Sequence, residues 1–346
     1  MRKVVNYLLY VIFLVFAAEF GLRVVSHFVY HTPILDIRRS RSDPYVVWKF
    51  NPGYTGKLFC FPHARVNRQG CLGKDLEEPK GADLIRIVAI GGSVSFGFGV
   101  TRMQDSYCSL LDSLLNHSAS PWRYEVANAG VIGYSSYMGR GFVEHHLESL
   151  QPDLLVVAFG WNDSLHDWAP DKDPVDRNRR RLDYSPRFWR ENFVLGVVLP
   201  KITGSLLRKI GDERLRQHEQ YDFDRDTVRF VPRVSLEDFR ANLEAMHQWC
   251  SEHHVKFVLV TESAANNSKN FAIAIQNLQP YHAVIRQTAA TLGVPLADVD
   301  SCLEVDGYQK YYDNEEFDYM HLNRLGQLRM AQVVKATLQQ SGCLSR

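Results

Sequence analysis

The sequence has little that would mark a disulfide-rich, zinc-binding or nucleic-acid-binding protein. Its 346 residues include only six cysteines, and none stand in a CxxC pair, which argues against a disulfide-dense scaffold or a zinc ribbon. The formal net charge of +1 gives no reason to expect a nucleic-acid partner. We find no internal repeat. A composition of 45% hydrophobic and 23% charged residues instead predicts an ordinary globular chain of one or two domains.

The N-terminus departs from this composition. After Met1, Arg2 and Lys3 the chain is almost wholly apolar to Ala18, and apolar residues continue to Val25. A helix needs roughly 20 residues to cross a bilayer core. Glu19 and Arg23 interrupt the run, but on a helix they can pair near the membrane interface. A cleaved signal peptide, an uncleaved anchor and a buried helix all fit. We favour a transmembrane anchor over residues 1–30, because the apolar run is longer than the apolar region of a typical signal peptide and the candidate cleavage site is weak.

Strands and helices alternate from residue 84 onward. Apolar runs that end in glycine or polar residues predict strands at 84–92, 123–130, 153–160 and 255–262, with a short one near 295–300. Helical spacing separates them, and a closing helix is predicted over 323–340. This alternation predicts an α/β fold with a parallel sheet covered on both faces.

Two further segments complete the predicted organisation. Residues 31–83, rich in proline and glycine, form an approach segment of hairpins and loops that leads to a domain over 84–346. Residues 164–232 are too long for a plain connection between two strands, so we predict an inserted cap or lid there.

The first predicted strand runs into Ser93 through the sequence "IVAIGGSVSFGFGV". A Walker loop would need Gly-Lys-Ser or Gly-Lys-Thr, and a dinucleotide fold would need GxGxxG with an acidic residue about 20 positions later. Neither is present. Ser93 is therefore either a turn residue or a nucleophile, and its partners must decide.

Candidate partners stand where the other strands end. Gly133 lies in "NAGVIG", Asn162 in "GWND", and both Asp318 and His321 in "DYMH" just before the closing helix. Taken singly, they read as a turn glycine, a helix cap and a surface histidine. Because ligands gather at the carboxyl edge of a parallel sheet, their coincidence there favours catalysis.

These residue types make a coherent acyl-transfer site. His321 can take the proton of the Ser93 hydroxyl, and Asp318 can bind the other ring nitrogen and fix the tautomer. The backbone N–H groups of Ser93 and Gly133, with the Asn162 amide, can form an oxyanion hole. The adjacent histidine pairs in the chain point apart on a helix, and no His-Glu-x-x-His is present, so we expect no metal and no cofactor.

The four blocks resemble, in order, those of the SGNH (GDSL-type) hydrolases. The resemblance spans about residues 84–340 and implies a flavodoxin-like three-layer α/β/α sandwich that cleaves or transfers ester-linked acyl groups. It places the nucleophile on Ser93, the oxyanion donors on Ser93, Gly133 and Asn162, and the orienter and base on Asp318 and His321. The usual Gly-Asp-Ser is Gly91-Gly92-Ser93 here, a variant that membrane-anchored members of the family share.

Three functions remain open. The first is a serine esterase acting on an acyl group, acetyl by preference, of a glycan or lipid. The second is an O-acyltransferase that passes the same acyl group from Ser93 to a sugar hydroxyl, since the acceptor depends on how the cap excludes water. The third is a catalytically silent binding or assembly module, which the intact Ser93, Asp318 and His321 argue against.

The anchor also predicts a location. Basic residues flank both ends of the apolar run, so the positive-inside rule decides little, but we expect the catalytic domain on the non-cytoplasmic side. Cys60 and Cys71 flank a short, turn-rich segment, where they could form a disulfide in an oxidising compartment or remain ordinary thiols.

Overall fold

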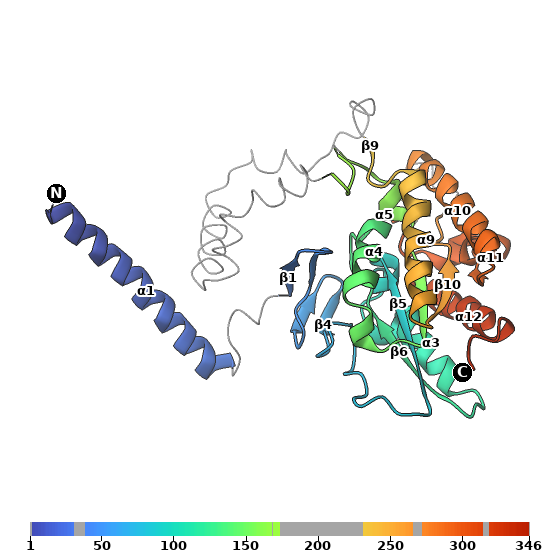
Figure 1. The fold of residues 1–346 in the computed structure, drawn as a ribbon, viewed down its shortest axis with the longest axis horizontal. Coiled ribbons are helices and arrows are strands. Elements are labelled where there is room, and N and C mark those ends of the chain that lie inside the picture. Colours follow the sequence, from blue (N-terminus) through green and yellow to red (C-terminus); the bar gives the residue numbers. More distant parts are fainter. Residues whose placement is uncertain are drawn as a thin grey trace. The chain divides into compact units, whose positions relative to one another are not determined.

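The structure is a computed structural model that describes residues 2–30, 39–167, 169–173, 231–265, 272–313 and 318–345 (Figure 1). The chain divides into two compact units. One comprises residues 1–41 and 174–230, and the other, the α/β domain, comprises residues 42–173 and 231–346. The domain boundaries predicted from the sequence stay predictions.

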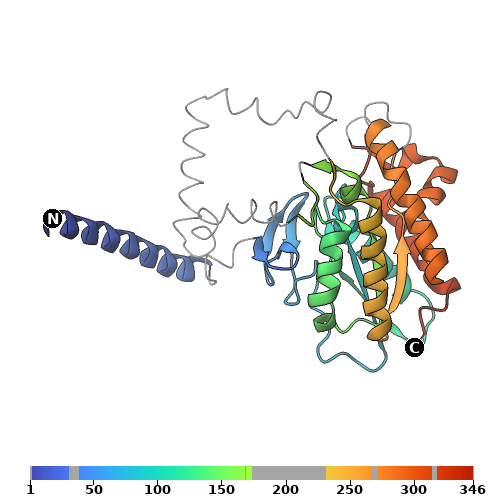
Figure 2. The same cartoon turned by 45° about the horizontal axis from the view of Figure 1, so that its top comes forward.

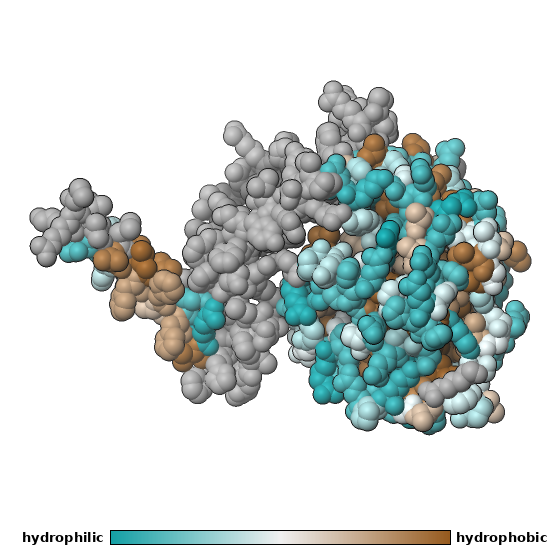
Figure 3. Space-filling view, viewed as in Figure 1, coloured by the Kyte–Doolittle hydropathy of each residue, from teal (hydrophilic) through white to brown (hydrophobic). Residues whose placement is uncertain are grey.

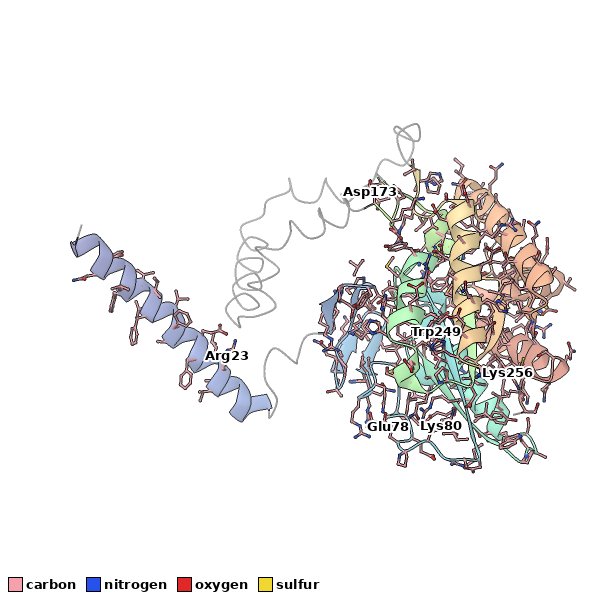
Figure 4. The ribbon with its side chains drawn as sticks, in the orientation of Figure 1. Arg23, Glu78, Lys80, Asp173, Trp249 and Lys256 are labelled. Carbon is pink, nitrogen blue, oxygen red and sulfur yellow. The ribbon has the colours of Figure 1, made fainter. Side chains whose placement is uncertain are left out.

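Helix α1 (Arg2–Tyr30) makes up most of the described part of the first unit. Glu19 and Arg23 pair along it as predicted, with Arg23 Nε 2.8 Å from Glu19 Oε1 (Figure 4). Many of its large apolar side chains are exposed, among them Phe13 and Phe20, and Figure 3 shows this apolar surface along the helix. None of the described helices has the combined length and hydropathy of a membrane span. The helix is therefore present, whereas the membrane anchor predicted for residues 1–30 is not shown.

The α/β domain is built on five parallel strands. They are β5 (Leu84–Gly91), β6 (Arg123–Asn128), β7 (Leu154–Ala158), β10 (Lys256–Val260) and β11 (Leu296–Ala297). Their order across the sheet is β6-β5-β7-β10-β11, which is the order of flavodoxin-like doubly wound sheets. Strands β5 and β7 are buried along their whole length, as the continuous Val, Ile and Leu runs predict for central parallel strands.

Helices cover both faces of this sheet, which gives the predicted three layers (Figure 2). On one face α3 (Tyr107–Asn116) packs against α12 (Arg324–Gln340), the predicted closing helix. On the other, α4 (Ser136–His145), α9 (Leu236–Glu252) and α10 (Ala272–Leu292) lie side by side. The shorter α11 (Val299–Asp306) follows β11 and contacts α12.

The approach segment forms the predicted hairpins. Strand β1 (Ser40–Asp43) pairs with β2 (Val47–Phe50), and β3 (Thr55–Leu58) pairs with β4 (Phe61–Arg65). The aromatic rings of Phe50, Phe59 and Phe61 surround Phe96, with centroids 5.0–5.8 Å from its ring. Phe96 ends the four-residue helix α2 (Ser93–Phe96), so this aromatic cluster supports the turn that carries Ser93.

The insertion leaves and re-enters the domain through a short ladder. After β7 and helix α5 (Trp161–Ser164), strand β8 (His166–Asp167) pairs antiparallel with β9 (Val231–Pro232). Asp173, labelled in Figure 4, is the last described residue before the gap. The predicted cap falls largely on residues 174–230, which lie outside the described residues.

All six cysteines are described, and all are unbonded. Cys71 is buried in the core, where desolvation raises the pKa of its thiol to about 12, and desolvation raises that of Cys60 to about 11. Of the two alternatives for Cys60 and Cys71, the structure has ordinary thiols and no disulfide.

Candidate active site

Ser93 is the first residue of α2, directly after the tight turn that leads out of β5, and two glycines make this turn possible. A Cβ on Gly91 would lie 2.3 Å from the Ala158 carbonyl oxygen. A Cβ on Gly92 would lie 2.5 Å from Asn162 Nδ2. Gly92 has a negative φ of −82°, so a side chain there would be opposed by the close approach of Asn162 and not by left-handed backbone. Ser93 is left at the carboxyl edge of the sheet, with 7% of its surface exposed.

His321 and Asp318 reach Ser93 from the loop before α12. His321 Nε2 lies 2.8 Å from Ser93 Oγ, and His321 Nδ1 lies 2.9 Å from both carboxylate oxygens of Asp318. Asp318 Oδ1 also accepts the backbone N–H groups of Met320 at 3.2 Å and His321 at 3.0 Å. The Asp-x-x-His spacing therefore folds the loop around the carboxylate and turns the ring toward the serine.

The electrostatics of the loop agree with this arrangement. Burial raises the pKa of Asp318, but its hydrogen bonds with His321 outweigh burial, and the pKa lies below its ordinary value. An ionised Asp318 favours the imidazole tautomer with hydrogen on Nδ1, which leaves Nε2 to accept the Ser93 hydroxyl. The Phe98 ring packs on the imidazole with centroids 4.5 Å apart and restricts its rotation.

Gly133 lies in a turn from Val131 to Tyr134, shortly after β6. Tyr134 N–H donates to the Val131 carbonyl at 3.1 Å, and Gly133 has φ +83°, the value that a type II turn demands at its third residue. Asn162, on α5, donates one amide hydrogen to the Tyr134 carbonyl at 2.9 Å. Among the described residues, neither Ser93 N–H nor Gly133 N–H has an acceptor.

Asn162 and Tyr134, the residue after Gly133, both approach the residue that precedes Ser93. The Asn162 amide and the Tyr134 carbonyl would lie 2.5 Å and 3.2 Å from a Cβ on Gly92, the residue before Ser93. The structure thus brings all five predicted site residues to one edge of the sheet. In the part of the chain that the structure describes, no group of three or more His, Cys, Asp or Glu side chains is arranged to hold a metal ion.

Two buried carboxyl groups beside Asn162 were missed by the sequence analysis. Glu262 Oε2 accepts Trp161 N–H at 3.0 Å, and Asp163 Oδ1 accepts Ser136 N–H at 2.9 Å. Desolvation raises the pKa of Glu262 to about 8 and that of Asp163 to about 6. Both residues stand at predicted strand ends, the signal that identified the other site residues.

A comparison with known families decides what the chain is. The profile of the GDSL-like Lipase/Acylhydrolase family matches residues 89–329, a range that includes every site residue described above. The chain belongs to this GDSL-like family. The predicted enzyme class, a serine hydrolase acting on ester bonds, is confirmed, and an acyl ester is its substrate. No curated protein matches the sequence.

Several solved structures are similar to this GDSL-like chain. LAE5, an alpha/beta hydrolase enzyme from the metagenome of Lake Arreo, Spain, is 18% identical with a TM-score of 0.47, over 76% of this chain and 97% of its own. Axe2, an acetylxylan esterase from Geobacillus stearothermophilus, is 15% identical with a TM-score of 0.48, over 75% and 94%. TesA is 17% identical with a TM-score of 0.45, over 74% and 98%. Likenesses this distant say nothing of this chain's own substrate.

Proposed function

We propose that the enzyme cleaves its ester through an acyl intermediate on Ser93, with His321 as base and Asp318 as the residue that orients it. The observation that carries this proposal is the continuous hydrogen-bonded chain from Asp318 through His321 to Ser93 Oγ, with a 2.8 Å contact at the serine. A serine hydroxyl is a weak nucleophile until a base takes its proton, and this chain supplies that base.

The reaction then has two halves. Ser93 Oγ attacks the carbonyl carbon while its proton passes to His321 Nε2, and the carbonyl oxygen becomes an oxyanion. Collapse of this intermediate breaks the ester bond, and His321 returns the proton to the leaving alcohol. Water next attacks the acyl-serine, again with His321 as base, and the carboxylic acid and free Ser93 are released.

The oxyanion hole in this proposal comprises Ser93 N–H, Gly133 N–H and the second amide hydrogen of Asn162. Two of these donors have no acceptor among the residues that the structure describes, and the Asn162 amide uses one hydrogen on the Tyr134 carbonyl. Donors held in place before the reaction stabilise the charge that develops in the transition state at little cost in reorganisation.

We further propose that the acyl group is short, acetyl before longer chains, and is carried by a glycan or a lipid. Ser93 is only 7% exposed, and Phe98 packs on His321 beside it, which favours a small acyl group. The Gly-Gly-Ser sequence, in which the Asn162 amide occupies the space of a side chain at Gly92, marks the chain in this proposal as the anchored variant of the family.

The test uses chromogenic acetyl, butyryl and octanoyl esters, with and without a glycan acceptor, and a fluorophosphonate probe. We expect the acetyl ester to be cleaved fastest, and the probe to label wild type but leave Ser93→Ala unlabelled. Equal labelling of the two proteins would contradict the nucleophile. An acetylated glycan formed in preference to free acetate would identify an O-acyltransferase instead.

The location of the enzyme is a separate proposal. We propose that α1 attaches it to a membrane, with the catalytic domain on the non-cytoplasmic side. Support comes from the exposed apolar side chains of α1 and from Arg2 and Lys3, which precede them. A C-terminal reporter that is active only after export should be active in the full chain and stay with membranes after a carbonate wash. Deletion of residues 1–30 should abolish both the reporter activity and the membrane retention. An inactive export-dependent reporter, together with an active C-terminal fusion to a reporter that works only in the cytoplasm, would overturn the proposal.

A further inference from the structure

The turn that carries Gly133 is held by residues at the base of the insertion. Arg233 directly follows β9, and its Nη2 donates to the Gly133 carbonyl at 2.9 Å. The same guanidinium forms a two-point ion pair with Asp171, from Nε to Oδ1 at 3.2 Å and from Nη2 to Oδ2 at 3.0 Å. Asp171 Oδ2 also accepts the Ser135 hydroxyl at 2.6 Å. Arg233 thus contacts the Gly133 turn itself, and Asp171 contacts Ser135, the residue that follows the turn.

This ion pair is itself fixed in place. The side chains of Arg233 and Asp171 are 13% and 2% exposed, so water competes little for their hydrogen bonds. Their backbones are also joined, because Asp171 N–H donates to the Arg233 carbonyl at 2.8 Å. Arg233 N–H in turn donates to the Leu165 carbonyl at 2.8 Å, next to β8. A planar guanidinium that is bound at two points can hold a third group in a defined direction.

The peptide between Gly133 and Tyr134 is consequently held at both polar atoms. Its carbonyl oxygen accepts from Arg233, and its N–H donates to the Val131 carbonyl at 3.1 Å. Rotation of this plane would disturb the turn and redirect the neighbouring Gly133 N–H. Glycine has no side chain to resist such rotation, so the turn depends on contacts of this kind.

We propose that Arg233 is a positioning residue for the oxyanion hole: held by Asp171, it fixes the Gly133 carbonyl and so keeps Gly133 N–H directed at the substrate oxygen. Arg233 acts through Gly133 and does not touch the reacting atoms. The inference rests on the proposed function, in which Gly133 N–H is an oxyanion donor. It adds a residue that none of the four family blocks contains.

The test compares Arg233→Met, Arg233→Lys and Ser135→Ala in the full-length enzyme on a chromogenic acetyl ester. The second readout is the inhibition constant of a trifluoromethyl ketone, whose serine adduct carries the oxyanion. We expect Arg233→Met to lower kcat roughly 10- to 100-fold with little change in KM, because one donor of the hole is misdirected but not lost. Ketone affinity should fall by about the same factor as kcat/KM. Arg233→Lys should recover part of the loss, and Ser135→Ala should lose less.

Arg240→Met is the matched control, since Arg240 is an arginine on α9 whose guanidinium makes an exposed hydrogen bond to Gln287. It should leave both readouts unchanged. A folded Arg233→Met with wild-type kcat and ketone affinity would overturn the inference, even if its melting temperature fell. If Arg233→Met does not fold, Ser135→Ala decides by the same criterion. Ser93→Ala separates the two proposals, because activity that survives in Ser93→Ala contradicts the nucleophile and not the role of Arg233.

Discussion

The two ends of strand β5 both bring polar groups into the interior, but they do so differently. Near the amino end, Arg86 is 1% exposed, and its guanidinium donates to Glu125 Oε2 at 2.7 Å, the Leu150 carbonyl at 2.7 Å and the Glu77 carbonyl at 2.6 Å. Just past the carboxyl end, Ser93 N–H has no acceptor among the described residues, and the same holds for Gly133 N–H. At the amino end the buried guanidinium has three acceptors, whereas at the carboxyl end two backbone N–H groups have none among the described residues.

This difference distinguishes buried polar groups that stabilise the fold from those that bind the reacting substrate. A buried donor without a partner costs about 1–3 kcal/mol, so a fold that serves stability alone would satisfy it. Each of these hydrogen bonds of Arg86 has a structural use: the bond to Glu125, for example, joins β5 to β6 at that end. The N–H groups of Ser93 and Gly133 gain an acceptor only when a substrate oxygen binds beside them. Variants at the two ends should therefore fail in opposite ways.

The largest effect should come from Ser93→Ala. Removal of the nucleophile should lower kcat by a factor on the order of 10⁴ to 10⁶, while the hydroxyl's single hydrogen bond to His321 leaves stability nearly unchanged. Steady-state kinetics and urea denaturation of the same preparation measure both. A large loss of stability with only a modest loss of activity would mean that Ser93 has a structural role and is not the nucleophile.

Arg86→Met should show the opposite pattern. Glu125 would be left buried without its partner at 2.7 Å, and we expect the free energy of unfolding to fall by about 3–5 kcal/mol. The kcat of the protein that remains folded should stay close to wild type. The double variant Arg86→Met/Glu125→Leu should recover much of the stability, and no recovery would mean that the carbonyl contacts, not the ion pair, matter.

Asn162→Ala tests the proposed oxyanion donors directly. Loss of the amide should lower kcat by roughly a hundredfold or more with little change in KM, because the oxyanion forms only in the transition state. The hydrogen bond to the Tyr134 carbonyl at 2.9 Å is lost as well, so a small fall in melting temperature is expected. Near-normal turnover with a large fall in melting temperature would make Asn162 a structural cap.

The smallest effect concerns Glu262 and pH. Its pKa rises from 4.5 to about 8 on folding, so the native state binds more protons than the unfolded chain between these values. The contribution of Glu262 to the free energy of unfolding is therefore greatest below pH 4.5 and is lost progressively as pH rises toward 8. Asp163, raised to about 6, contributes only below that pH.

Urea denaturation at pH 6, 7 and 8 measures how steeply the free energy of unfolding changes with pH. Glu262→Gln keeps an acceptor for Trp161 N–H and should flatten the slope between pH 6 and 8. An unchanged slope in Glu262→Gln would mean that another group causes the pH dependence of stability.

The sequence analysis located the strand ends well, because apolar runs stop where polar residues begin. The predicted strand at 84–92 corresponds to β5 over Leu84–Gly91, and Ser93 follows it as expected. Arg233 escaped this reasoning, since its contact with Gly133 spans 100 residues and no periodicity marks it. The close approach of the Asn162 amide to Gly92 likewise joins residues that are far apart in the sequence, so no local pattern predicts it.

The ladder of β8 and β9 has a consequence for how this domain can vary. Asp167 pairs with Val231, so the chain from 168 to 230 begins and ends at nearly the same point. Closing a flexible loop costs only about 0.6 kcal/mol more for each doubling of its length. Changes in chain length between Asp173 and Val231 should therefore cost the sheet little free energy, provided that the β8–β9 pair and the Asp171–Arg233 ion pair survive. The length of this part of the chain can in this way change while the hydrogen bonds among Ser93, His321 and Asp318 stay the same.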